Sequence, residues 1–158
     1  MSDLETNIQA VLDLVASVRS DGARTVVGLA GPPGSGESTL AAGVVDRLNA
    51  GAEGTGQAAL VPMDGFHLDN AELDARGLRS VKGAPQTFDA AGFVDLVRRL
   101  REMGGDVRFP LFDRAEDRTV PEAGLIRAGT PVAVVEGNYL LLADGAWADL
   151  APFFDVTV

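Results

Sequence analysis

Apolar residues recur along this chain in two alternating patterns, one with helical spacing and one as short continuous runs. Apolar positions three or four residues apart predict amphipathic helices at about residues 2–20, 38–48 and 89–103. Continuous runs rich in valine and alanine predict buried strands at about residues 25–30, 58–63 and 131–136. Strands that alternate with helices in this order predict an α/β fold with a mainly parallel sheet.

The remaining segments are shorter or less regular. We expect a short helix at 70–77, a strand near 107–109 and a last strand at 153–158. Residues 78–88 contain glycine and proline breakers and are expected to be irregular. No internal repeat, low-complexity tract or linker interrupts this pattern, so residues 1–158 are expected to form a single domain.

The composition is strongly acidic, with a formal net charge of −10. Such a surface repels nucleic acid and anionic lipid, and we expect neither nucleic acid nor a membrane as a partner. It also repels a polyanion such as ATP unless a local site overcomes the repulsion. The chain has no cysteine, no membrane-length apolar run and no signal-peptide order at its start. The expected location is therefore the cytoplasm.

A glycine-rich turn between the first predicted strand and the next helix matches the P-loop pattern Gly-x-x-x-x-Gly-Lys-Ser/Thr, except at the lysine. Glycines in such a loop let backbone N–H groups surround an anion, and the helix N-terminus adds partial positive charge. The Ser38 hydroxyl is placed to bind Mg²⁺. An ordinary glycine-rich turn is the alternative, and the spacing and the flanking strand and helix disfavour it. The expected phosphate-binding residues are Gly31, Pro32, Pro33, Gly34, Ser35, Gly36, Glu37, Ser38 and Thr39.

Glu37 stands where the P-loop pattern has its lysine. A lysine there would neutralise the β- and γ-phosphates of a nucleotide, whereas a carboxylate adds a like charge. Losing one member of a desolvated charge pair costs about 2–5 kcal/mol, which corresponds to about two to three orders of magnitude or more in affinity or rate. Glutamate is nevertheless favourable in the first turn of a helix. The sequence thus predicts an intact fold with weak nucleotide binding and impaired turnover.

Two acidic residues follow predicted strands. Asp64 comes directly after the second strand, and Glu136 ends the strand at 131–136. Ligands of an open α/β sheet lie at the carboxyl ends of the strands, so both acids are expected beside the P-loop. Asp64 could accept the proton of an attacking hydroxyl and help to hold Mg²⁺, and Glu136 could hold the metal directly or through water. Each acid alone could be a solvated strand end, but both at the edge of a P-loop favour function.

Four segments resemble, in order and spacing, bacterial type I pantothenate kinase, the related uridine kinases and "DGFH" kinase-like proteins. They are Asp64-Gly65-Phe66, Arg76-Gly77-Leu78, the run from Lys82 to Asp89 and Glu136-Gly137-Asn138. The resemblance implies that Asp64 is the catalytic base and Glu136 the acid of the metal and acceptor site. It also implies acceptor contacts by Asp89, an aromatic ring at Phe112 and a basic residue at Arg118. His67 and Lys82 are further acceptor-site candidates. A hydrogen-bonded structural histidine is an equally good interpretation of His67, and a single basic residue in a loop, such as Lys82, is more often simply solvated.

The resemblance also implies a P-loop three-layer sandwich that uses ATP and Mg²⁺ to phosphorylate a hydroxyl of a small metabolite. Pantothenate, nucleosides and sugars all stay open as the acceptor, and a homodimer is expected because members of this family are often dimers. Such kinases continue beyond residues 153–158 into a lid helix, so the chain is expected to be truncated relative to the family. A non-catalytic nucleotide- or anion-binding or regulatory pseudokinase module is the alternative, favoured by Glu37 and the missing lid. A P-loop hydrolase is disfavoured, because the Asp64 and Asp89 segments suit an acceptor.

Overall fold

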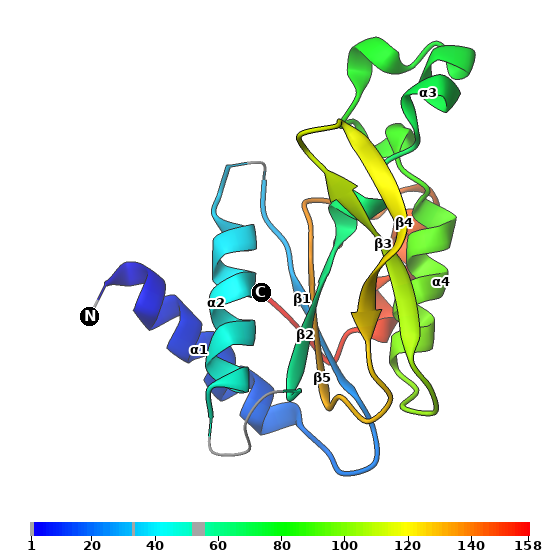
Figure 1. Cartoon of the computed structure of the whole chain (residues 1–158). Coiled ribbons are helices and arrows are strands. Elements are labelled where there is room, and N and C mark those ends of the chain that lie inside the picture. Colours follow the sequence, from blue (N-terminus) through cyan, green and yellow to red (C-terminus); the bar gives the residue numbers. More distant parts are fainter. Residues whose placement is uncertain (1, 33, 52–55) are drawn as a thin grey trace.

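Four parallel strands form the central sheet of the computed structural model, which describes residues 2–32, 34–51 and 56–158 (Figure 1). Their order across the sheet is β2, β5, β1 and β6. The strands are β1 (Thr25–Leu29), β2 (Ala58–Pro62), β5 (Val132–Glu136) and β6 (Val156–Thr157). The mainly parallel α/β fold expected from the sequence is confirmed.

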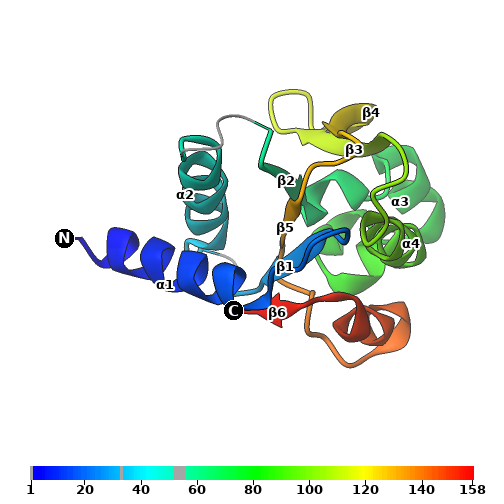
Figure 2. The same cartoon turned by 90° about the horizontal axis from the view of Figure 1, so that it is seen from below.

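Helices cover both faces of this sheet. Helices α1 (Asp3–Val18) and α2 (Glu37–Asn49) pack on one face, and α4 (Ala90–Leu100) packs on the other (Figure 2). Alternate residues of β1 and β5 point to opposite faces, as the period of a strand requires. Val27 and Val134 are buried under α1 and α2, whereas Val26 and Val135 belong to the core that includes the apolar side of α4. The result is the three-layer sandwich that the family resemblance implies.

A second sheet contains only the antiparallel hairpin of β3 (Val107–Asp113) and β4 (Arg118–Ile126). The expected strand near 107–109 is therefore longer, and β4 was not expected at all. Strand β4 is partly exposed, and its polar residues, a proline and a glycine hide the alternation on which strand prediction depends.

The last strand is shorter than the sequence predicts. The segment expected as a last strand at 153–158 contains only the two residues of β6, because Phe153 belongs to a 3₁₀ turn. The short helix α3 (Asn70–Arg76) is present as expected, and two 3₁₀ turns lie within 78–88. Within the described ranges, no helix is long and apolar enough to cross a bilayer.

The guanidinium of Arg24 is fully buried and connects the start of β1 with the end of α4 and with the segment before β5. It donates to the carbonyl oxygens of Thr130 at 2.8 Å, Leu100 at 3.0 Å, Glu102 at 2.9 Å and Arg127 at 3.0 Å. These carbonyls belong to the end of α4 and the segment that leads into β5. Burial lowers the pKa of Arg24 from its ordinary value, and the four carbonyl partners compensate for the lost hydration.

Replacing Arg24 with methionine is expected to lower the free energy of unfolding by about 3 kcal/mol, because four carbonyl oxygens lose a charged donor. For a protein of this size that corresponds to a fall in Tm of roughly 6–12 °C. Urea and thermal unfolding followed by circular dichroism would measure both quantities. Arg98→Met is the matched control, because Arg98 is exposed and forms a surface ion pair with Asp95. Equal effects of the two substitutions would contradict this account of Arg24.

Candidate active site

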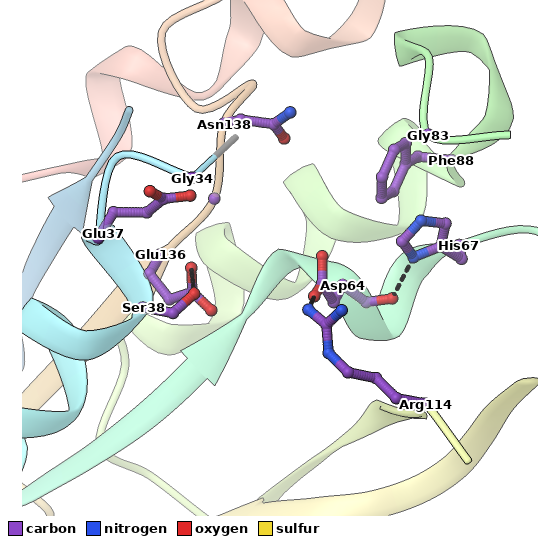
Figure 3. A pocket seen from close by; sticks show the side chains of 12 residues that line it. Gly34, Glu37, Ser38, Asp64, His67, Gly83, Phe88, Arg114, Glu136 and Asn138 are labelled. Carbon is purple, nitrogen blue, oxygen red and sulfur yellow. Dashed lines mark hydrogen bonds and ion pairs between the residues drawn. The ribbon is translucent and has the colours of Figure 1, made fainter. Parts of the chain in front are cut away.

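A cavity of about 500 Å³ lies at the carboxyl edge of the central sheet. The strand register aligns Leu29 of β1 and Pro62 of β2 with Glu136 of β5, so the residues that follow these strands share one edge. The glycine turn after β1, Asp64 after β2 and Glu136 all line the cavity (Figure 3). The glycine turn, Asp64 and Glu136 therefore lie around one cavity, as the sequence predicted.

The glycine turn has the backbone shape of an anion-binding loop. Gly34 and Gly36 have φ values of 80° and 90°, a left-handed conformation that side chains disfavour, and Gly36 leads directly into α2. A side chain at Gly31 would collide with the Ser35 hydroxyl. The described part of this loop thus leads into a helix N-terminus facing the cavity, as phosphate binding requires. Pro33, also expected in this loop, lies outside the described residues.

Glu37 brings a carboxylate into this loop. Its Oε2 atom accepts a 2.5 Å hydrogen bond from the Ser35 hydroxyl, and Figure 3 shows the carboxylate turned toward Gly34. Glu37 lines the main cavity and a neighbouring one beside α1, while Thr39 lines only the neighbouring one. A phosphate seated in the turn would therefore meet a like charge.

Ser38 and Glu136 form an oxygen pair beside the turn. The Ser38 hydroxyl donates to Glu136 Oε2 at 3.1 Å, and Glu136 is only 6% exposed. Burial raises the pKa of the Glu136 carboxyl, and the nearby Asp64 and Glu37 carboxylates act in the same direction. The hydrogen bond from Ser38 and the Arg114 guanidinium act against this increase. A cation near Glu136 would offset the repulsion among the three carboxylates.

These oxygens suit Mg²⁺ better than a metal that needs a complete protein cage. Among the described residues, no three His, Cys, Asp or Glu side chains are grouped closely enough to hold a metal ion by themselves. Mg²⁺ in nucleotide sites usually takes one or two protein ligands and completes its octahedron with phosphate and water. Ser38 and Glu136 fit that arrangement.

Asp64 lies in a 3₁₀ turn, Met63–Phe66, directly after β2. Its Oδ2 atom is 2.9 Å from Nη2 of Arg114, which projects from the turn between β3 and β4. Gly65 lets the turn that carries Asp64 lie close to β3, because any side chain there would collide with the carbonyl oxygen of Pro110 in β3. The sequence prediction missed Arg114, although its place two residues after Phe112 in the suspected acceptor segment was a signal.

His67 stands beside Asp64 in the wall of the cavity. Its Nδ1 atom lies 2.7 Å from the Asp64 carbonyl oxygen, so this nitrogen carries the proton and donates it. The ring packs at a tilt against Phe88 and Phe112, at centroid distances of 4.2 Å and 4.7 Å. Phe88 and His67 border the cavity, whereas Phe112 contacts His67 without lining the cavity. His67 therefore has a well-defined structural role and also reaches the site.

Lys82, Asp89 and Arg118 do not line this cavity. Lys82 binds Asp117 at 2.7 Å and lies over the Phe112 ring. Asp89 caps α4 by accepting from the Gly92 N–H at 3.0 Å and borders a neighbouring hollow. Arg118 pairs with Glu116 at the start of β4. Their roles toward an acceptor remain predictions from the resemblance.

No protein-family model matches this chain. It is 42% identical over 135 residues to the uncharacterized protein YggC of Escherichia coli, covering 85% of this chain and 55% of that protein. It is 36% identical to a "putative uridine kinase" of Schizosaccharomyces pombe, covering 84% and 58%. It is 33% identical to a pantothenate kinase of Leifsonia xyli, covering 84% and 42%. The chain spans about half the length of these curated relatives.

One solved structure is similar both in sequence and in fold. It is described as a "putative fructose transport system kinase" from Silicibacter sp. TM1040. The two chains are 40% identical and superpose with a TM-score of 0.79, over 99% of this chain and 73% of the other.

Proposed function

Since this chain belongs to the family of P-loop kinases related to pantothenate and uridine kinases, we propose that it transfers the terminal phosphoryl group of ATP to a hydroxyl of a small metabolite. The observation that carries the proposal is the convergence of the glycine turn, Ser38, Asp64 and Glu136 on one cavity. A cytoplasmic location and a homodimer are part of the same proposal.

In this reaction Asp64 orients the acceptor hydroxyl and takes its proton. The acceptor oxygen forms a bond to the terminal phosphorus, the bond from that phosphorus to the bridging oxygen breaks, and ADP leaves. The backbone of the glycine turn would hold the donor phosphates, and Ser38 with Glu136 would hold Mg²⁺. When bound, Mg²⁺ supplies positive charge that balances the phosphate oxygens. The chain's own contribution is therefore position, charge and one proton acceptor.

The acceptor side of the cavity combines polar and flat apolar surfaces. Asp64 offers a hydrogen-bond acceptor, and Phe88 and His67 offer ring surface. Such a wall suits a small polyhydroxylated compound or a nucleoside, and a sugar such as fructose belongs among the first acceptors to test. Pantothenate belongs there as well.

Thermal unfolding with and without MgATP, combined with a panel of acceptors, tests the proposal. We expect MgATP to raise Tm by mass action, and one acceptor to raise it further and to yield a product heavier by one phosphoryl group in mass spectrometry. A protein that neither MgATP nor any acceptor stabilises, and that forms no product over long incubation, would refute the proposed kinase.

A non-catalytic nucleotide- or anion-binding module is the second candidate, and the Glu37 carboxylate in the phosphate turn is the observation that favours it. The same experiment separates the two functions. Stabilisation by MgATP or inorganic phosphate without any product, even after prolonged incubation with every acceptor, would favour the binding module.

A further inference from the structure

We propose that Arg114 binds the phosphates of the donor nucleotide and supplies the positive charge that the lysine of the P-loop pattern would otherwise give. The inference rests on the proposed function and adds to it a phosphate-binding residue outside the P-loop. It follows from the position of Arg114, from the charges around it and from the ease with which its present ion pair can be exchanged.

Arg114 occupies a position from which it can serve the cavity. It lies in the short turn that joins β3 to β4, and its guanidinium extends to Asp64, as Figure 3 shows. Of the described residues that line the cavity, Arg114 is the only arginine or lysine. Lys82 is held by Asp117 and Asn70 and does not reach this cavity.

The residues that line the cavity carry more negative than positive charge, so a cation is needed before phosphates can bind there. Three carboxylates border it, those of Glu37, Asp64 and Glu136, against the single guanidinium of Arg114. The influence of Arg114 reaches beyond its partner, because its charge also acts on the buried Glu136 carboxyl that contacts Ser38. Arg114 thus lies within electrostatic range of both acids that flank the expected metal position.

The ion pair between Arg114 and Asp64 is suited to exchange. The Arg114 side chain is 82% exposed and that of Asp64 is 36% exposed, and surface pairs of this kind contribute little to stability. A guanidinium binds phosphate oxygens through two parallel hydrogen bonds, which an ammonium cannot do. Movement of Arg114 from Asp64 to the phosphates would therefore replace a weak contact with a stronger one.

This exchange would also free the Asp64 carboxylate to act as the general base. While Arg114 occupies Asp64 Oδ2, that oxygen is engaged with a cation and is less available to an acceptor hydroxyl. Transfer of Arg114 to the donor phosphates frees Asp64 to accept the proton. Binding of the donor nucleotide would then be coupled to release of the catalytic carboxylate.

The alternative is a fastening role, in which the ion pair only attaches the hairpin to the Asp64 turn. In that case the loss of Arg114 would alter stability but would leave phosphate affinity unchanged. Isothermal titration of the full chain with Mg·ATP and with inorganic tripolyphosphate separates the two roles, because neither probe requires an acceptor. Arg108→Gln is the matched control, since Arg108 is an exposed arginine on the same hairpin outside the cavity.

We expect Arg114→Gln to weaken binding of both probes by roughly tenfold or more, and Arg108→Gln to leave it unchanged. Arg114→Lys should fall between wild type and Arg114→Gln, because it keeps the charge and loses the bidentate contact. In a Glu37→Lys background the effect of Arg114→Gln should shrink, because the new lysine supplies the missing charge.

Equal affinities of wild type and Arg114→Gln would overturn the inference and leave the proposed kinase intact. Binding by Glu37→Lys alone, with none by wild type, would also overturn it, because Arg114 would then fail to replace the lysine. Absence of binding in both wild type and Glu37→Lys would instead refute the proposed function itself.

Discussion

Replacing Glu37 with lysine is expected to tighten MgATP binding and to raise the rate of phosphoryl transfer by about two to three orders of magnitude. The substitution removes a carboxylate that lies against the phosphate turn and places a cation there. Restoring one member of a desolvated charge pair gains about 2–5 kcal/mol, and each 1.4 kcal/mol is a factor of ten. The gain should appear in both affinity and rate, because the phosphates carry charge in both states.

Titration calorimetry and single-turnover kinetics of wild type, Glu37→Lys and Glu37→Gln would measure this effect. Glu37→Gln removes the repulsion without adding a cation, so we expect it to fall between the other two. Glu37 also lies in the first turn of α2, where a negative charge is favourable. Glu37→Lys should therefore cost about 0.3–1 kcal/mol of stability while it improves binding. Identical affinities and rates for all three proteins would show that Glu37 does not limit the site.

Changing Asp64 to asparagine is expected to reduce phosphoryl transfer by about 10²–10⁴-fold, the usual contribution of a positioned general base. Asparagine has nearly the same shape but cannot take the proton of the acceptor hydroxyl. Nucleotide binding should stay the same or improve, because one of the three carboxylates is removed and Arg114 is released from its ion pair. The Asp64→Asn substitution should therefore lower kcat without weakening nucleotide binding.

Where the wild-type rate is too low to measure, the same comparison should be made in the Glu37→Lys background. Asp144→Asn is a suitable control, because Asp144 is exposed and lies outside the cavity. If the Asp64→Asn variant transfers phosphoryl groups at the parent rate, Asp64 is not the general base. Another group would then have to be the base.

Local sequence was enough to predict the buried strands of the central sheet and the cavity residues that follow those strands. The valine-rich runs that became β1 and β5 are buried on both faces, and a continuous apolar run is the signature of such strands. The turn at 31–38 has the spacing of the P-loop pattern, and Gly34 and Gly36 adopt backbone angles that other residues disfavour. Asp64 and Glu136 could be placed beside it because parallel strands end at the same edge.

Contacts between distant parts of the chain decided the rest. Arg114 meets Asp64 across 50 residues of sequence, through a hairpin whose second strand carries no clear alternation. Arg24 reaches carbonyls 76 to 106 residues away, and no pattern around it predicts burial of its charge. Asp89 in turn caps α4 outside the cavity, although the motif around it suggested an acceptor contact. Spacing along the chain fixes periodicity and backbone angles, whereas a charge finds its partner only when packing brings remote segments together.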